Sequence, residues 1–378
     1  MNKSIYILFS LLLFISCKKQ QETNNEEINT NKNSKIEYAK GFDISYQEGY
    51  KVITLKNAWP GTKKVFKYAL IEEATILDFP EQYDAIVTIP IKNIVVTSTT
   101  HIPSLEMLAV DQTLIGFPNL DYISSKKTRE RINKGLIKEL GKNEAINTES
   151  LIELSPDVVI GFAVDGNNKT FNTLKKTGIP VLYNGDWTET SPLGKAEWIK
   201  FFAAFYNKEA LANKLFSEIK TEYLNAKKLA LKAKNRPAVL SGAMYKDIWY
   251  LPQGKSWAAQ FIADANGEYL WSESEGTGSH SLNLESVLEK GEHAQFWIGP
   301  SYYTTMKQLK EAHAVYKQFD AFKNDQVYSF THKVGDTGGL LYFELAPNRP
   351  DIVLKDMIKI LHPELLSNHN LYFFDQLK

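Results

Sequence analysis

Short apolar runs and amphipathic segments alternate along most of this chain. From residue 94 onward, apolar runs are separated by stretches whose apolar residues recur every three or four positions. The runs are typical of buried strands, and the stretches are typical of helices that cover a sheet. Strands of this first series are predicted at residues 94–97, 113–116, 157–160 and 179–183. The alternation predicts an α/β fold whose parallel sheet is covered on both faces.

The same alternation begins again after Pro237. Predicted strands then cover residues 238–240, 248–251, 295–298 and 326–330, and Pro350 opens the last clear helix. Proline is well suited to the first turn of a helix, because its missing N–H is not needed there. The chain therefore predicts two Rossmann-like lobes, one on each side of residue 237.

One long helix is predicted between the two lobes. Asn207 is a suitable N-cap, and an apolar face then continues to about residue 234. At 1.5 Å per residue this helix would be about 40 Å long, so we expect a rigid bridge. The residues of its apolar face are Leu211, Leu215, Ile219, Tyr223, Ala226 and Ala230.

A seven-residue phrase occurs twice, once in each lobe. Residues 147–153 read NTESLIE and residues 283–289 read NLESVLE, so the copies start 136 residues apart. Each copy opens a predicted helix and is followed by a predicted strand. A repeat at about one domain's length indicates two similar halves, each with a glutamate in the first turn of a corresponding helix.

The first residues are typical of a targeting segment. A positive Lys3 is followed by an apolar run over residues 5–15, which is too short to span a membrane stably. The run ends at Cys17, the only cysteine of the chain, and resembles a bacterial lipoprotein signal in which that cysteine is lipidated. The alternative is an ordinary secretory signal with a chance cysteine. We expect an exported, membrane-anchored lipoprotein of the periplasm or cell envelope.

These patterns divide the chain into six segments. Almost nothing in residues 18–35 is apolar, which predicts a flexible tether, and residues 36–92 read as strands and turns. The predicted segments are a signal peptide (1–17), a tether (18–35), a β extension (36–92), an N-terminal lobe (93–190), connecting helices with the long helix (191–235) and a C-terminal lobe (236–378).

Composition excludes several classes of function. The 378 residues include 44 basic and 44 acidic side chains, so the formal net charge is zero and nothing indicates a nucleic-acid partner. With Cys17 lipidated, no thiol remains for a disulfide or a thiolate metal site. The chain has no P-loop, dinucleotide fingerprint or serine nucleophile elbow, and its 7 histidines are not spaced as metal ligands. We expect no cofactor and no protein-bound metal site.

Aromatic and hydroxyl side chains follow many of the predicted strands. In parallel α/β sheets, ligands bind beyond the carboxyl ends of the strands, so these residues are candidates for a cleft between the lobes. Aromatic rings interleaved with hydroxyls suit a large, partly apolar ligand. The candidate ligand-binding residues are Thr99, His101, Tyr122, Phe162, Trp187, Tyr245, Trp249, Tyr302 and Tyr303.

Several stretches resemble the substrate-binding proteins of bacterial ABC importers for ferric siderophores, haem and vitamin B12. The resemblance covers about residues 94–366 and rests on residues 147–160 (NTESLIELSPDVVI), 171–181 (FNTLKKTGIPV), 284–288 (LESVL) and 348–351 (NRPD). It implies two α/β lobes bridged by one rigid helix, a monomer, and an iron-siderophore, haem or corrinoid ligand. Residues 36–92 lie outside the part that resembles the family.

The resemblance also implies a role for the repeated glutamates. In that family one glutamate of each lobe docks onto arginines of the membrane permease, and the matching residues are Glu149 and Glu285. Two carboxylates on a rigid frame could orient the complex and speed its formation. Alternatively, each glutamate only complements the dipole of its helix, behind the N-caps Asn147 and Asn283.

Two other functions remain open from the residues alone. A carrier of bare zinc or manganese would need converging histidine and carboxylate ligands. An exported α/β enzyme would use the same scaffold, because fold does not determine function. Aromatic residues lining a wide cleft would disfavour the first, and a strongly shifted pKa deep in the cleft would favour the second.

Overall fold

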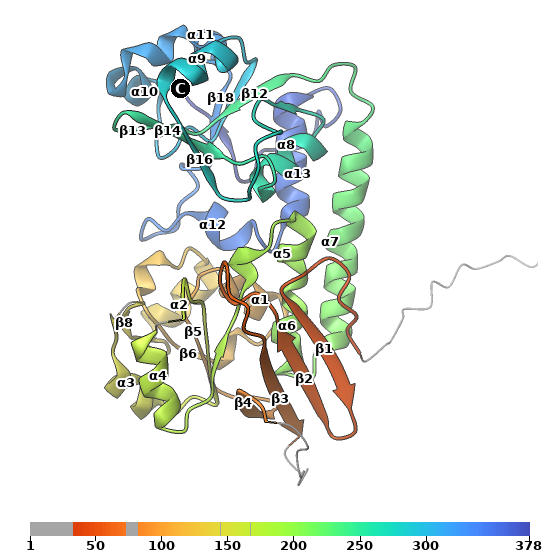
Figure 1. The fold of residues 1–378 in the computed structure, drawn as a ribbon, viewed down its shortest axis with the longest axis vertical. Helices are drawn as coiled ribbons and strands as arrows, with labels where there is room; N and C mark the ends of the chain where they lie inside the picture. Colours follow the sequence, from red (N-terminus) through yellow and green to blue (C-terminus); the bar gives the residue numbers. More distant parts are fainter. Residues whose placement is uncertain (1–32, 73–81, 144, 167) are drawn as a thin grey trace, which may run out of the picture. The chain divides into compact units, whose positions relative to one another are not determined.

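The computed structural model describes residues 33–72, 82–143, 145–166 and 168–378 (Figure 1). Within it, Lys32–Lys378 forms one compact unit. The predicted signal peptide, its Cys17 and most of the predicted tether lie outside the described residues. At the end of that tether, Ser34 is buried, and its hydroxyl donates a 2.9 Å hydrogen bond to Asn213 Oδ1.

The N-terminal lobe is built on a five-stranded parallel sheet in the order β11-β10-β5-β6-β7. Its strands are β5 (Ile94–Val96), β6 (Leu114–Phe117), β7 (Lys138–Glu139), β10 (Val158–Gly161) and β11 (Val181–Tyr183). The α/β alternation expected from the sequence is therefore present. The helices are α1 (His101–Met107), α2 (Lys126–Asn133), α3 (Thr148–Leu154) and α4 (Lys169–Lys176), and β8 (Gly141–Lys142) and β9 (Ala145–Ile146) form a small hairpin.

The C-terminal lobe has a second five-stranded sheet in the order β15-β12-β17-β18-β19, in which only β19 is antiparallel. Its strands are β12 (Ala238–Ser241), β15 (Glu268–Tyr269), β17 (Phe296–Ile298), β18 (Val327–Ser329) and β19 (Asp375–Gln376). Its helices are α8 (Trp257–Asp264), α9 (Leu284–Gly291), α10 (Met306–Ala312), α11 (Asp320–Lys323), α12 (Leu341–Leu345) and α13 (Pro350–Leu361).

One predicted strand of this lobe does not join the parallel sheet. Residues 248–251 fall in β14 (Ile248–Pro252), which lies between β13 (Ala243–Tyr245) and β16 (Ser279–Leu282) in a separate antiparallel sheet. A two-residue turn joins β13 to β14, and such a connection allows only antiparallel pairing. Trp249 is the second residue of β14, so it does not lie at the carboxyl end of a parallel strand as expected.

The two sheets have the same connectivity around the repeated phrase. Strand β10 follows the repeat helix α3 and lies next to β5, the first strand of its sheet. Strand β17 follows the repeat helix α9 and lies next to β12, the first strand of its own sheet. On its far side each of these strands is paired with the next one, β11 or β18. The repeat therefore marks equivalent positions in two lobes of similar topology.

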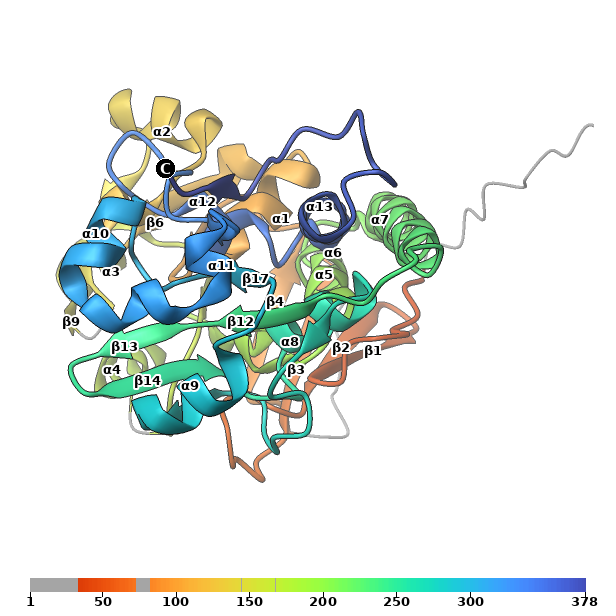
Figure 2. The same ribbon diagram turned by 90° about the horizontal axis from the view of Figure 1, so that it is seen from above.

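The long helix α7 (Glu209–Ala230) runs along both lobes (Figure 1) and is seen nearly end-on in Figure 2. Its residues contribute to both hydrophobic cores. Its 22 residues span about 33 Å, shorter than predicted mainly because the helix ends at Ala230 and not near residue 234. At its start Asn207 is left-handed and Lys208, not Asn207, is the N-cap. Phe216 and Ile219 belong to the first core, whereas Tyr223, Ala226 and Ala230 belong to the second. The helix packs against α6 (Ile199–Ala204) and α13, and α5 (Pro192–Glu197) precedes α6.

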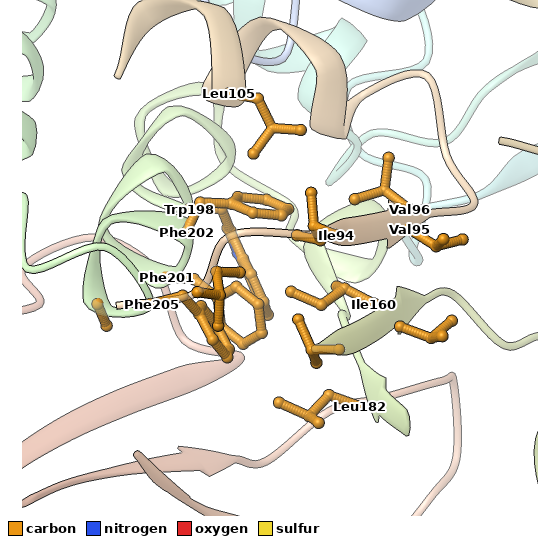
Figure 3. Packing of buried hydrophobic residues seen from close by; sticks show 14 of the residues in the cluster. Ile94, Val95, Val96, Leu105, Ile160, Leu182, Trp198, Phe201, Phe202 and Phe205 are labelled. Atoms are coloured by element: carbon orange, nitrogen blue, oxygen red, sulfur yellow. The ribbon is translucent and has the colours of Figure 1, made fainter. Parts of the chain in front are cut away.

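Four strands between Phe42 and Ile89 form a sheet that shares the core of the N-terminal lobe. Its strands, in spatial order, are β1 (Phe42–Gln47), β2 (Tyr50–Leu55), β3 (Phe66–Glu72) and β4 (Ala85–Ile89). Phe42 packs against Trp198 with 4.5 Å between ring centroids, and Tyr68 Oη accepts a 3.0 Å hydrogen bond from Tyr183 N. Figure 3 shows Trp198 and the phenylalanines of α6 packed beside Ile94 and Ile160 of the parallel sheet. The predicted β extension is thus an integral layer of this lobe.

Candidate functional site

A cleft of about 410 Å³ lies between the two lobes, where the N-terminal strands end. Its N-terminal wall comes from the ends of β5, β6 and β10, the loops that follow them, and the turn between β8 and β9. The wall consists of Thr97, Ser98, Thr99, Phe117, Pro118, Tyr122, Asn143 and Phe162. Its C-terminal wall consists of Tyr302, Gly338, Gly339, Leu340 and Phe343. Four of the residues predicted from the strand ends line this cleft: Thr99, Tyr122, Phe162 and Tyr302.

Hydrogen bonds connect the loops that form the N-terminal wall. Thr97 O accepts a 2.9 Å bond from Asn143 Nδ2, and Thr97 Oγ1 accepts a 3.4 Å bond from Phe162 N. Position 161, directly before Phe162, requires glycine, because a Cβ there would lie 2.2 Å from the Phe171 ring. The wall is therefore preorganised by the sheet and by the helix that covers it.

The cleft is aromatic and carries no charge among its described lining residues. Five rings contribute, from Phe117, Tyr122 and Phe162 in one lobe and Tyr302 and Phe343 in the other. Tyr122 and Tyr302 are 64% and 74% exposed, so their rings are available to a ligand. A cleft of this kind can bury a large flat molecule but offers no ion pair to a highly charged one.

Apart from Tyr302, the C-terminal wall belongs to a strap, residues 334–344, that docks on the N-terminal lobe. Glu344 accepts hydrogen bonds from Ser124 N at 2.6 Å and Ser125 N at 2.9 Å. Thr337 Oγ1 donates to Asp121 O at 2.7 Å, and a Cβ on Gly339 would lie 2.3 Å from Tyr122 O. The strap therefore fixes one end of the cleft, a role that the sequence did not predict.

The carboxyl group of Glu344 titrates near neutral pH. Burial raises its pKa to about 7, against the opposing effect of the N–H donors of Ser124 and Ser125. The nearby carboxylate of Glu106 acts in the same direction as burial. The folded protein thus holds this proton to a higher pH than the unfolded chain does.

We expect stability to depend on pH through Glu344. An acid with a raised folded pKa stabilises the fold below its ordinary pKa, and this contribution is lost as pH rises through about 7. Urea unfolding of the wild type and of Glu344→Gln should show the wild type losing stability relative to the variant between about pH 5 and about pH 8. Titrating groups that do not interact with Glu344 cancel in this comparison. A difference that does not change with pH would contradict the assignment.

Two predicted ligand residues lie in hydrophobic cores instead. His101 is fully buried, and its ring packs on Phe202 at 5.1 Å because α1 begins at this residue and turns it inward. Burial lowers the pKa of His101, and within the described residues neither ring nitrogen has a hydrogen-bond partner. Trp249 is fully buried, and its indole Nε1 donates to Ser241 O at 3.0 Å. Neither residue lines the cleft.

The remaining three predicted residues also lie outside the lining of this cleft. Tyr245 is 67% exposed at the end of β13. Tyr303 is half-buried and packs against Tyr316, with 6.2 Å between ring centroids. Trp187 is 39% exposed and lines a different pocket. A strand end therefore predicts proximity to the cleft but not the direction of each side chain.

Glu149 and Glu285 occupy equivalent positions on α3 and α9. Asn147 Oδ1 accepts from Ser150 N at 3.0 Å, and Asn283 Oδ1 accepts from Ser286 N at 2.8 Å, so both asparagines are N-caps as predicted. Both glutamates are exposed and form no ion pair with any described residue. Their carboxylates are available to a partner.

The described parts of the chain contain neither a metal-ligand cluster nor a membrane-spanning helix. These residues contain no group of three or more histidine, cysteine, aspartate or glutamate side chains that could hold a metal ion. Nor does any helix among them have the length and apolar character needed to cross a membrane.

Comparison with known proteins gives a consistent set of similarities. The sequence model of the periplasmic binding protein family matches residues 94–334. An uncharacterized lipoprotein of Methanocaldococcus jannaschii is 30% identical over 298 residues, which is 76% of this chain and 69% of the relative.

Solved structures share the fold. A possible iron-binding, periplasmic solute-binding protein of Staphylococcus epidermidis has a TM-score of 0.57 at 16% identity, over 72% of this chain and 99% of that chain. The periplasmic haem-binding protein of Vibrio cholerae has a TM-score of 0.53 at 17% identity, over 70% of this chain and 99% of that chain. The predicted architecture of two α/β lobes and a long connecting helix is confirmed.

Proposed function

The chain belongs to the periplasmic binding protein family, and we propose that it is the lipid-anchored receptor of an ABC importer. Proteins of this family are binding proteins and not enzymes, which is the class predicted from the sequence. In this proposal the receptor is held at the membrane through Cys17, binds a metal complex between its lobes and delivers it to a permease.

We favour a tetrapyrrole, either haem or a corrinoid, as the ligand. The observation that carries this choice is the aromatic cleft, which has no charged side chain among its described lining residues. A macrocycle can stack on these rings, and its polar edge can remain in water beside the exposed Tyr122 and Tyr302. A strongly anionic siderophore would lose hydration there without gaining a cationic partner.

A carrier of bare zinc or manganese receives less support. Such ions need several converging histidine, carboxylate or other polar ligands. The described lining of the cleft contains only hydroxyls and one amide, from Asn143, in addition to its rings and backbone.

Titration of the form that lacks residues 1–17 tests this proposal. That form retains the compact unit Lys32–Lys378. Haemin, cyanocobalamin, a neutral ferric hydroxamate and an anionic ferric catecholate would be added separately, and binding followed by tryptophan fluorescence and absorbance. We expect saturable one-to-one binding of haemin or cyanocobalamin. Saturation by a siderophore alone would contradict the choice of a tetrapyrrole, and binding of none of the four would contradict the proposed function.

Replacing Phe162 or Tyr302 by alanine should weaken ligand binding. Each substitution removes one ring from the cleft wall and therefore one stacking surface, so we expect a loss of about tenfold in affinity for each. Tyr372→Ala is a matched control, because this tyrosine is 44% exposed and does not line the cleft. The control should bind the ligand as the wild type does. Equal losses in all three variants would contradict the placement of the ligand.

A further inference from the structure

A second pocket, of about 500 Å³, is formed jointly by several parts of the compact unit, and three of them contribute a tryptophan. The loop that joins β2 to β3 contributes Trp59, the segment after β11 contributes Trp187, and the first residue of α8 contributes Trp257. A Cβ on Gly185 would lie 2.2 Å from Asn57 O, so the β2–β3 loop rests directly on the segment after β11. This pocket shares no lining residue with the aromatic cleft.

The three indoles of this pocket differ from three of the four core indoles in their N–H groups. Trp198, Trp249 and Trp297 donate from Nε1 to Glu189 Oε1, Ser241 O and Gly242 O, at 3.3, 3.0 and 2.8 Å. Within the described part of the chain, the Nε1 groups of Trp59, Trp187 and Trp257 have no acceptor. Each pocket indole therefore has a donor that a ligand could use.

One ammonium and one carboxylate complete the pocket, and both residues are more than nine-tenths buried. Lys195 Nζ donates to Asp186 O at 3.1 Å and Trp187 O at 3.2 Å, and lies 5.3 Å from the centre of the Trp257 ring. Glu189 Oε1 accepts from Lys40 N and Gly41 N at 2.7 and 2.6 Å. Because the ammonium and the carboxylate have charges of opposite sign, the pocket favours an uncharged ligand that carries both hydrogen-bond donors and acceptors.

We propose that this pocket binds a carbohydrate. The C–H groups of a pyranose ring match the electron-rich face of an indole, and its hydroxyls can both accept from the indole N–H groups and donate to Glu189 or a threonine. Thr188, Thr190 and Thr277 supply hydroxyl groups at the rim. Trp59 lies outside residues 94–334, the part matched by the family, so the N-terminal sheet adds this site to the common fold.

Fluorine NMR of the protein labelled with fluorotryptophan tests the proposal. The chain has 7 tryptophans, and single tryptophan-to-phenylalanine variants assign their resonances. Glucose, galactose, N-acetylglucosamine and their β-1,4-linked oligomers would be titrated into the full chain in detergent micelles. We expect at least one sugar to shift the resonances of Trp59, Trp187 and Trp257 saturably, while those of Trp198, Trp249 and Trp297 stay in place.

Trp187→Ala should weaken binding of that sugar by about tenfold or more, because it removes the most exposed of the three indoles. Tyr372→Ala, another exposed aromatic outside this pocket, should leave the affinity unchanged. Unshifted core resonances in Trp187→Ala would show that this variant is folded. The proposal is overturned if no sugar shifts the three pocket resonances, if core and pocket resonances shift alike, or if Trp187→Ala binds as tightly as the wild type.

Discussion

Reversing both repeated glutamates, as Glu149→Arg with Glu285→Arg, is expected to abolish uptake while leaving the ligand Kd of the purified protein unchanged. Both carboxylates are exposed on helices at equivalent positions, one in each lobe. If each contacts an arginine of the permease, reversal turns two attractions into repulsions. Close charge pairs contribute about 1.5 kcal/mol or more each, so the affinity for the permease should fall at least about a hundredfold.

The repeat supplies its own control for this experiment. Glu153 and Glu289 lie four residues further along the same two helices and are also exposed. The variant Glu153→Arg with Glu289→Arg changes the net charge equally and should transport normally. Uptake of radiolabelled haemin or cyanocobalamin by cells that carry each variant measures the difference. Normal transport by the Glu149 and Glu285 double variant would show that these residues act only on their helix dipoles, an effect of about 0.3–1 kcal/mol each.

The duplicated fold could be predicted because it rests on local signals. The asparagine N-caps, the helix periodicity and the following apolar strands all lie within single stretches of sequence. The long helix α7 was predicted too long mainly at its C-terminal end, because it stops at Ala230 and not near residue 234. At its start the left-handed Asn207 is not the N-cap that was predicted. Asn207 Oδ1 accepts a 2.6 Å hydrogen bond from Lys51 Nζ, a contact 156 residues away that sequence periodicity cannot reveal.

The candidate site was only partly predictable, because a strand end has two sides. Phe162 directly follows β10 and lines the cleft, as expected for a residue at the end of a parallel strand. The segment Ile248–Pro252, in contrast, is apolar almost throughout. Alternation therefore could not show that Trp249 faces the core while Ile248 and Tyr250 face outward.

The strap over residues 334–344 carried no local signal. Its glycines allow close approach to Tyr122 and Ser124. Glu344 accepts hydrogen bonds from backbone N–H groups, which every residue type except proline carries. The hydrogen bonds of Glu344 join residues 220 and 219 positions apart in the sequence. They depend on tertiary structure alone, so neither composition nor spacing could predict that the strap docks on the N-terminal lobe.

Replacing Trp249 by alanine is expected to destabilise the C-terminal lobe by about 3–5 kcal/mol, the usual cost of removing a buried aromatic residue. Its ring stacks on Trp297 at 5.4 Å and packs on Tyr316 at 5.6 Å and Phe319 at 5.4 Å. The substitution would leave a cavity among these rings and remove the hydrogen bond to Ser241 O. Urea unfolding followed by near-UV circular dichroism should show the loss as a lower midpoint.

Two further variants separate packing from ligand contact at this position. Trp249→Phe keeps an aromatic ring but leaves Ser241 O without the indole donor, so it should cost less than alanine, about 1–3 kcal/mol. Trp187→Ala, at the 39% exposed tryptophan, should change stability by no more than about 0.5 kcal/mol. If Trp249→Ala unfolded at the wild-type midpoint but failed to bind haemin or cyanocobalamin, Trp249 would be a ligand contact after all. The buried stack with Trp297 argues for the opposite result, because a ring enclosed on all sides can reach a ligand only if the core opens.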